Sequence, residues 1–166
     1  MRGACENCGN WLDSSGLTIS RLCSRCMYLP GQVQNENCIP PMTVHNVWCA
    51  LNAFKFGGSS ELELQNAIEK ALARVGWTDV RREVELQGLD GPAGRIDFMV
   101  GLVGLEIKID GSQAAVTRQC HRYLEASVDG KPLESLLLAT TKSGHRLPST
   151  MNGKDVMVAW LKRGIM

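Results

Sequence analysis

The chain has 166 residues and a mass of 18.2 kDa, which corresponds to one ordinary domain with room for a small additional module. Hydrophobic residues make up 44% and charged residues 21%, a composition typical of globular rather than disordered chains. The net charge of +1 argues against a uniformly basic coat protein, and no apolar run approaches the roughly 18 residues of a membrane span. The first residues, MRGACENCGN, lack the apolar segment of a secretory signal, so we expect a cytoplasmic protein with no membrane partner.

Charge is distributed unevenly along the sequence. Residues 32–111 carry eleven acidic and seven basic side chains, whereas residues 112–166 carry four acidic and eight basic ones. An acidic middle next to a basic C-terminal third suits a protein that holds cations at one place and phosphates nearby. Scattered surface charge gives the same division, so this pattern alone does not decide the function.

Four cysteines cluster at the N-terminus as two CxxC pairs separated by 14 residues. In a reducing compartment this spacing is typical of four thiolates on one tetrahedral zinc ion. The alternatives are redox-active dithiols or unrelated free thiols, but the thioredoxin-like pattern that accompanies redox pairs is missing. Residues 1–31 also contain few aliphatic side chains, so the segment needs a metal to fold. The sequence therefore predicts a structural zinc module over residues 1–31, with Cys5, Cys8, Cys23 and Cys26 as ligands.

A connecting segment spans residues 32–58. It begins with an irregular stretch rich in Pro, Asn and Gln and continues into a short apolar segment, residues 43–54, that can form a helix. Within it, Cys38, His45 and Cys49 allow a second metal site, because His45 and Cys49 lie one helical turn apart. The alternative is buried thiols beside a polar histidine, and the sequence leaves both open.

Regular periodicity begins after FGGSS and predicts the main domain over residues 59–166. The first helix is capped by Ser59 or Ser60, with Glu63 in reach for a capping box, and ends at Gly76. Ser112 caps the second helix. The element order predicts an α/β fold with a mixed sheet flanked by helices. The expected elements are a helix over 61–75, strands over 80–88, 95–101 and 104–110 with a turn at 89–94, a helix over 112–127, and strands over 133–141 and 155–161.

Three charged residues lie within two short apolar strands. Asp97 belongs to one strand, and Glu106 and Lys108 lie two residues apart on the next, so both point to the same face. Two carboxylates that converge across adjacent strands can hold a hard divalent cation such as Mg²⁺, and a lysine beside them can neutralise a phosphate oxygen. This combination suits metal-assisted phosphodiester hydrolysis. The alternative is a solvated ion pair at a sheet edge.

With its strand context and following helix, this array resembles the PD-(D/E)XK nuclease superfamily. Asp97 stands at the family's Asp position, and Glu106 and Lys108 stand at its (D/E)xK pair. Ile96 replaces the proline that usually precedes the Asp. The helix that follows reads QCHRY, so Gln119 and Tyr123 match the QxxxY element of the RecB-like branch. The resemblance covers residues 59–161 and also extends to small nucleases of phages and mobile elements.

The resemblance implies a restriction-endonuclease-like core with a further acid on the first helix. We select Glu61, because it continues the inward stripe that Leu64 and Ile68 define, while Glu63 remains the alternative. Glu69 is expected to face solvent. The implied catalytic set comprises Glu61, Asp97, Glu106, Lys108, Gln119 and Tyr123, with Glu61, Asp97 and Glu106 holding Mg²⁺ or Mn²⁺.

We therefore expect a divalent-metal-dependent nuclease that cleaves DNA with structure selectivity or weak sequence specificity. A phage or mobile-element origin implies the cytoplasm of a bacterial host, and a homodimer is compatible with two-strand cutting. The sequence leaves open endonuclease or exonuclease action and activity on RNA. The alternatives are a non-catalytic nucleic-acid-binding or assembly protein that retains the nuclease fold, and a zinc-ribbon adaptor. Basic residues that could contact phosphate are Arg95, Arg118, Arg122, Lys142, His145 and Arg146.

Overall fold

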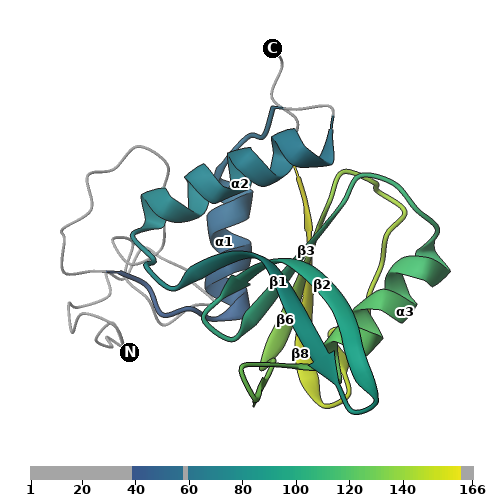
Figure 1. Cartoon of the computed structure of the whole chain (residues 1–166). Coiled ribbons are helices and arrows are strands. Elements are labelled where there is room, and N and C mark those ends of the chain that lie inside the picture. Colours follow the sequence, from purple (N-terminus) through teal and green to yellow (C-terminus); the bar gives the residue numbers. More distant parts are fainter. Residues whose placement is uncertain (1–38, 58–59, 162–166) are drawn as a thin grey trace, which may run out of the picture.

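The computed structural model describes residues 39–57 and 60–161, which form an eight-stranded mixed sheet with helices on both faces. The strand order is β5-β4-β1-β2-β3-β6-β8-β7. Figure 1 shows the curled sheet with α1 and α2 on one side and α3 on the other, which confirms the predicted mixed sheet flanked by helices. The helices are α1 (Val44–Ala53), α2 (Glu61–Val75) and α3 (Gln113–Leu124); the strands are β1 (Val80–Gly88), β2 (Gly91–Val100), β3 (Val103–Lys108), β4 (Ser127–Val128), β5 (Lys131–Pro132), β6 (Ser135–Thr140), β7 (Thr150–Met151) and β8 (Lys154–Trp160).

The predicted caps set the ends of the helices. At the start of α2 the Ser60 hydroxyl accepts a hydrogen bond from the Glu63 backbone N–H, and the Glu63 carboxylate accepts one from the Ser60 backbone N–H, each at 3.2 Å. This is the predicted capping box. Gly76 ends α2 with a φ of 89°, a conformation that favours glycine. Ser112 caps α3 through the backbone N–H of Ala115, as predicted.

The sheet consists of an antiparallel half and a parallel half that share β3. β1, β2 and β3 pair antiparallel, whereas β3, β6 and β8 run parallel. The pairing aligns Lys108 with Thr140, and Thr140 with Trp160, so the carboxyl ends of the three parallel strands lie side by side at one end of the sheet. All six residues of β6 are buried, which agrees with its continuous apolar run and its place between β3 and β8.

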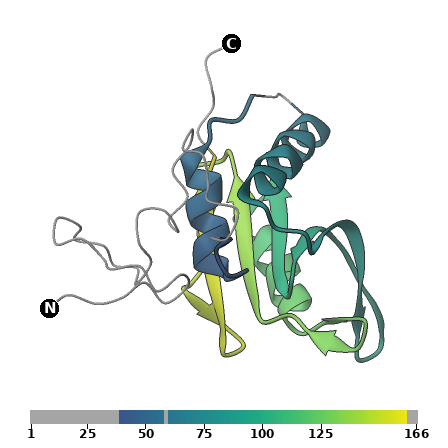
Figure 2. The same cartoon turned by 90° about the vertical axis from the view of Figure 1, so that its left-hand side faces the viewer.

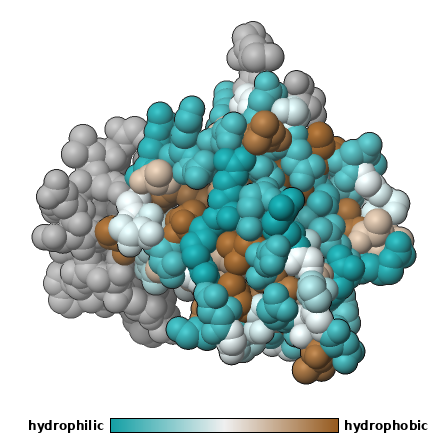
Figure 3. All heavy atoms as spheres, viewed as in Figure 1, coloured by the Kyte–Doolittle hydropathy of each residue, from teal (hydrophilic) through white to brown (hydrophobic). Residues whose placement is uncertain are grey.

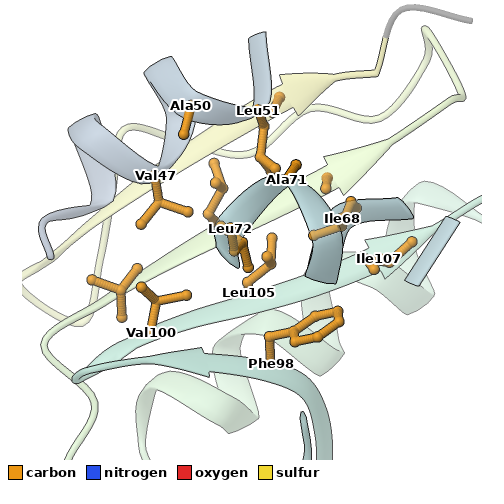
Figure 4. Packing of buried hydrophobic residues seen from close by; sticks show 14 of the residues in the cluster. Val47, Ala50, Leu51, Ile68, Ala71, Leu72, Phe98, Val100, Leu105 and Ile107 are labelled. Atoms are coloured by element: carbon orange, nitrogen blue, oxygen red, sulfur yellow. The ribbon is translucent and has the colours of Figure 1, made fainter. Parts of the chain in front are cut away.

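Two apolar clusters hold the helices on the sheet. On the α1 and α2 side, Ile68 and Leu72 pack against alternate residues of β3, including Leu105 and Ile107 (Figure 4). The α3 side buries a second cluster around Tyr123. Because alternate residues of a strand face opposite sides, the apolar residues of β3 face α2 while Glu106 and Lys108 face α3. The predicted common face of Glu106 and Lys108 is therefore confirmed.

Helix α1 belongs to the packed domain, although it lies within the segment 32–58 that the sequence assigns to a connection. Val47, Ala50 and Leu51 are at most 1% exposed and pack in the same cluster as α2 (Figure 4). Figure 2 shows α1 lying beside β8. The indole N–H of Trp48 donates to the carbonyl of Val158 on β8 at 2.9 Å. The packed domain therefore extends N-terminally beyond residue 59.

The remaining differences concern short elements. β2 begins at Gly91, so the turn expected over 89–94 is reduced to the two residues Leu89 and Asp90 at a hairpin tip. Three two-residue strands, β4, β5 and β7, were not predicted because two residues carry no periodicity.

The face of the molecule shown in Figure 3 is largely hydrophilic. Within the described part of the chain, no helix is long and apolar enough to cross a membrane.

Candidate active site

The predicted acids and lysine converge in an open pocket of about 390 Å³ between α2 and α3. Asp97 and Glu106 are 8% and 2% exposed, respectively. The ammonium nitrogen of Lys108 lies 2.6 Å from Oε1 of Glu106, so these two side chains share one face of β3 as predicted. The pocket is lined by Glu61, Leu62, Gln65, Glu83, Arg95, Asp97, Glu106, Lys108 and Gln119.

The carboxylate of Asp97 is fixed by hydrogen bonds at both oxygens. Oδ2 accepts from the backbone N–H of Ile107 on the neighbouring strand at 2.6 Å, and Oδ1 accepts from the side-chain amide of Gln65 on α2 at 2.7 Å. Burial raises the pKa of Asp97, and the Ile107 hydrogen bond opposes part of that rise. Asp97 therefore joins three elements, β2, β3 and α2, at the floor of the pocket.

Glu106 is bound asymmetrically. Its Oε1 atom accepts hydrogen bonds from Lys108 and from the amide of Gln119, the latter at 2.8 Å. Its Oε2 atom is buried and has no hydrogen-bond partner among the described residues. Burial and the nearby charge of Asp97 raise the pKa of Glu106 to about 7. The site therefore contains one buried carboxylate oxygen to which no residue of the described chain donates a hydrogen bond.

Lys108 keeps its positive charge. Burial alone lowers the pKa of a lysine, but the hydrogen bond and the negative charge of Glu106 outweigh this effect and raise the pKa of Lys108. The side chain is 22% exposed, so its ammonium group remains accessible from the pocket. It is therefore equipped to donate hydrogen bonds to an anion rather than to accept a proton.

Of the QxxxY pair on α3, Gln119 is the residue that contacts Glu106. The Gln119 amide donates to Oε1 of Glu106 at 2.8 Å and to the Tyr123 hydroxyl at 2.7 Å. Tyr123 is 2% exposed, and its hydroxyl donates to the backbone carbonyl of Arg95 at 2.7 Å. Tyr123, predicted among the catalytic residues, thus lies two hydrogen bonds away from Glu106, through Gln119, and does not line the pocket.

Of the three acids considered on α2, Glu61 alone lines the pocket. Its charge contributes to the raised pKa values of Asp97 and Glu106. Glu63 completes the capping box, and Glu69 pairs with Arg82 at 3.2 Å. The geometry favours the selection of Glu61 over Glu63. In the arrangement described for residues 39–57 and 60–161, no group of three His, Cys, Asp or Glu side chains is close enough to hold a metal ion.

Sequence reasoning did not identify Gln65, whose side chain is buried at 7% exposure and links α2 to β1 and β2 at the pocket. Its amide nitrogen donates to Asp97 and, at 3.1 Å, to Glu83, while its oxygen accepts from Arg82 at 2.8 Å. Glu83 in turn pairs with Arg95 at 2.6 Å. The available signal was the position of Gln65 one helical turn after Glu61 on the same face.

Glu83 has an unusual backbone conformation for a residue within a strand. Its φ of 54° lies in the left-handed region, which is unfavourable for a residue with a side chain. The conformation accompanies a carboxylate that contacts both Gln65 and Arg95 at the pocket wall. Glu83 therefore forms part of the pocket wall.

Other candidate residues lie away from the pocket or outside the described chain. His145 is 1% exposed and packs between Thr140 and Gly111. The thiol of Cys49 lies 3.5 Å from the His45 ring, but their suggested partner Cys38 is outside the described residues. The predicted zinc ligands Cys5, Cys8, Cys23 and Cys26 are also outside them.

Comparisons of this chain with protein-family models, with curated proteins and with solved structures give no match.

Proposed function

We propose that this protein is a divalent-metal-dependent nuclease that hydrolyses DNA phosphodiester bonds. The observation that carries the proposal is the buried Glu106 carboxylate, which has Lys108 and Gln119 on one oxygen and no protein partner among the described residues on the other. A second acid, Asp97, is held beside it across two strands. Two acids and a lysine in an open pocket combine cation binding with recognition of a phosphate.

The Oε2 atom of Glu106 indicates that the site suits a hard cation. An unpartnered buried carboxylate oxygen is unfavourable, and a divalent ion supplies the missing positive charge. Asp97 and Glu106 would hold Mg²⁺ or Mn²⁺, with Glu61 as the third acid. When bound, such an ion lowers the pKa of a water molecule and stabilises negative charge on the phosphate.

The protein groups around these acids have separate tasks. Lys108, which stays protonated, donates to a phosphate oxygen and stabilises the charge that develops there. Gln119 and Gln65 hold the two carboxylates from opposite helices. Arg95 lies at the pocket wall with 64% of its side chain exposed, where it can bind a neighbouring phosphate.

The N-terminal cysteines belong to the same proposal. Cys5, Cys8, Cys23 and Cys26 bind one structural zinc, and the module of residues 1–31 strengthens DNA engagement. Elemental analysis of the purified full chain should give one zinc per molecule. Replacing Cys5 and Cys8 with Ser should release it, whereas replacing the buried Cys120 should not.

A second candidate function is a non-catalytic nucleic-acid-binding or assembly protein that retains this fold. It is favoured by the protein hydrogen bonds that already occupy both oxygens of Asp97 and one oxygen of Glu106. The absence of a three-residue metal cluster in the described part of the chain points the same way. Against it, a binding-only surface gains nothing from carboxylates that repel phosphate.

One experiment separates the two functions. Supercoiled, linear, branched and single-stranded DNA are incubated with the full chain and Mg²⁺, Mn²⁺ or EDTA, and calorimetry measures metal binding in parallel. The nuclease proposal expects metal-dependent cleavage that Glu106→Gln abolishes. Metal-independent DNA binding without cleavage of any substrate would favour the second candidate. RNA in the same panel tests whether activity extends beyond DNA.

A further inference from the structure

The parallel half of the sheet places an exposed aromatic residue beside the candidate active site. Lys108, Thr140 and Trp160 are in register at the carboxyl ends of β3, β6 and β8. Alternation along these strands puts all three on the α3 side, because their neighbours Leu138 and Val158 pack in the α3 cluster. At the ordinary spacing of strands, the Cα atoms of Lys108 and Trp160 are about 10 Å apart.

Trp160 and Arg146 form a cation–π pair at this end of the sheet. The guanidinium carbon of Arg146 lies 4.8 Å from the centre of the Trp160 ring. Trp160 is 44% exposed and Arg146 is exposed as well. The pair therefore presents flat aromatic and cationic surfaces to solvent in line with Lys108.

The loop that carries Arg146 is tightly anchored. The buried His145 ring lies 2.8 Å from the Thr140 hydroxyl, which also accepts from the backbone N–H of Lys142 at 3.1 Å. Gln113, at the start of α3, binds Arg146 twice, with its oxygen on the backbone N–H and its amide on the carbonyl. The Arg146 guanidinium in turn donates to the backbone carbonyls of Ser143 and His145. Together these contacts fix where Arg146 is presented.

We propose that Arg146 and Trp160 form a stacking platform for an unpaired nucleobase of the DNA strand whose backbone passes Lys108. Bases stack on aromatic rings and on guanidinium planes without sequence preference, and the positive charge favours a polyanion. A base within a duplex is already stacked on both faces, so the platform selects single-stranded, frayed or branched DNA. This inference rests on the proposed nuclease function and specifies the substrate class of the same site.

The test measures DNA binding apart from cleavage. Fluorescence anisotropy follows a fluorescein-labelled single-stranded oligonucleotide and the matching blunt duplex, with Ca²⁺ as the added cation and gels to confirm that the DNA stays intact. The full-length variants are Trp160→Ala, Trp160→Phe and Arg146→Ala. Lys131→Ala is the matched control, because it removes one exposed positive charge on β5, at the opposite edge of the sheet.

We expect Trp160→Ala to weaken binding of the single strand about tenfold and binding of the duplex less than about twofold. Trp160→Phe keeps a stacking face and should lose less. Arg146→Ala should reduce single-strand affinity more than Lys131→Ala does. Equal losses for Arg146→Ala and Lys131→Ala, with Trp160→Ala unchanged, would overturn the platform.

The result also separates the platform from the nuclease proposal. If the wild-type chain cleaves no substrate with Mg²⁺ but shows the expected Trp160 effect, the platform stands and the catalytic assignment falls. If it cleaves duplex and single-stranded DNA alike, and Trp160→Ala leaves the ratio of the two rates unchanged, the catalytic assignment stands and the platform falls.

Discussion

The α2 side and the α3 side of the pocket hold their acids in different ways. On the α2 side, Asp97 accepts one hydrogen bond at each oxygen, from Gln65 and from the backbone of Ile107. On the α3 side, Glu106 accepts two at Oε1, while no described residue binds its Oε2. Asp97 is thus a fixed anchor, and Glu106 is the acid with an oxygen left for a ligand.

The difference has a direct chemical consequence for amide substitutions. Asparagine at position 97 must turn its NH₂ group toward one of two donors, because both Asp97 oxygens face N–H groups. Glutamine at position 106 can keep its oxygen on Lys108 and Gln119 and place its NH₂ where Oε2 has no partner among the described residues. Asp97→Asn is therefore expected to disturb the folded structure, whereas Glu106→Gln should change only the charge of the site.

The largest expected effect is on cleavage. Glu106→Gln and Asp97→Asn each remove a carboxylate that the proposed metal requires and should abolish Mg²⁺-dependent cleavage of supercoiled plasmid. Lys108→Ala should reduce the single-turnover rate on the order of a hundredfold while DNA affinity changes little, because its contact strengthens as charge develops on the phosphate.

Glu134→Gln is the control for these carboxylate substitutions, since Glu134 is exposed and does not line the pocket. It should cleave at the wild-type rate. A Lys108→Ala variant that loses affinity but not single-turnover rate would make Lys108 a simple phosphate anchor. Cleavage at the wild-type rate by Asp97→Asn would refute the assignment of that acid.

The second effect is a pH dependence of stability that comes from the α3 side. The pKa of Glu106 is raised to about 7, so the folded protein binds its proton more tightly than the unfolded chain does. Proton binding by Glu106 therefore stabilises the folded protein by about 3 kcal/mol below the ordinary carboxyl pKa. This stabilisation is lost as pH rises toward 7. Denaturant unfolding in EDTA should show this loss in the wild type relative to Glu106→Gln.

Added Mg²⁺ sharpens the same measurement. If Glu106 holds the ion, Mg²⁺ should restore most of the stability lost at neutral pH in the wild type and leave Glu106→Gln unchanged. Parallel pH profiles for the two proteins in EDTA would show that Glu106 titrates normally.

The third effect is a loss of folding stability on the α2 side. In Asp97→Asn, the new NH₂ group faces either the Ile107 N–H or the Gln65 amide. Gln65 cannot rotate its amide to relieve this, because Arg82 donates to its oxygen and Glu83 accepts from its nitrogen. The unfolding free energy at pH 5 should fall by about 1–3 kcal/mol.

Asp97→Ala provides a comparison for this prediction, since it removes both acceptors without adding a donor. Adding Gln65→Leu to Asp97→Asn should remove one of the opposed donors. The double variant should then lose less unfolding free energy than the sum of the losses of the two single variants. Strict additivity would contradict the proposed conflict at Gln65.

The sequence predicted the parts of this molecule that depend on local periodicity and capping. Helix α2 and strand β1 lie where periodicity and alternation place them, because Ser60, Glu63 and Gly76 set the helix ends and a short turn ends the strand. The convergence of Asp97 with Glu106 was predictable because adjacent strands in a meander place such residues side by side.

The α2 network could not be predicted in the same way. Gln65 acquires its partners only when α2 packs over β1 and β2, since Glu83 and Asp97 lie 18 and 32 residues away along the chain. The left-handed backbone of Glu83 likewise has no local signal, because glycine and not glutamate favours that conformation. These features depend on tertiary packing.

The smallest expected effect concerns Tyr123, which supports the α3 side from behind. Its hydroxyl accepts from Gln119 and donates to the Arg95 carbonyl, and neither contact reaches a carboxylate directly. Tyr123→Phe should therefore reduce the unfolding free energy by about 1 kcal/mol and slow cleavage less than tenfold. Gln119→Leu, which also removes the contact to Glu106, should slow cleavage more than Tyr123→Phe does. Denaturant unfolding and single-turnover rates measure both, and a Tyr123→Phe variant as inactive as Glu106→Gln would show that the phenol acts on the substrate itself.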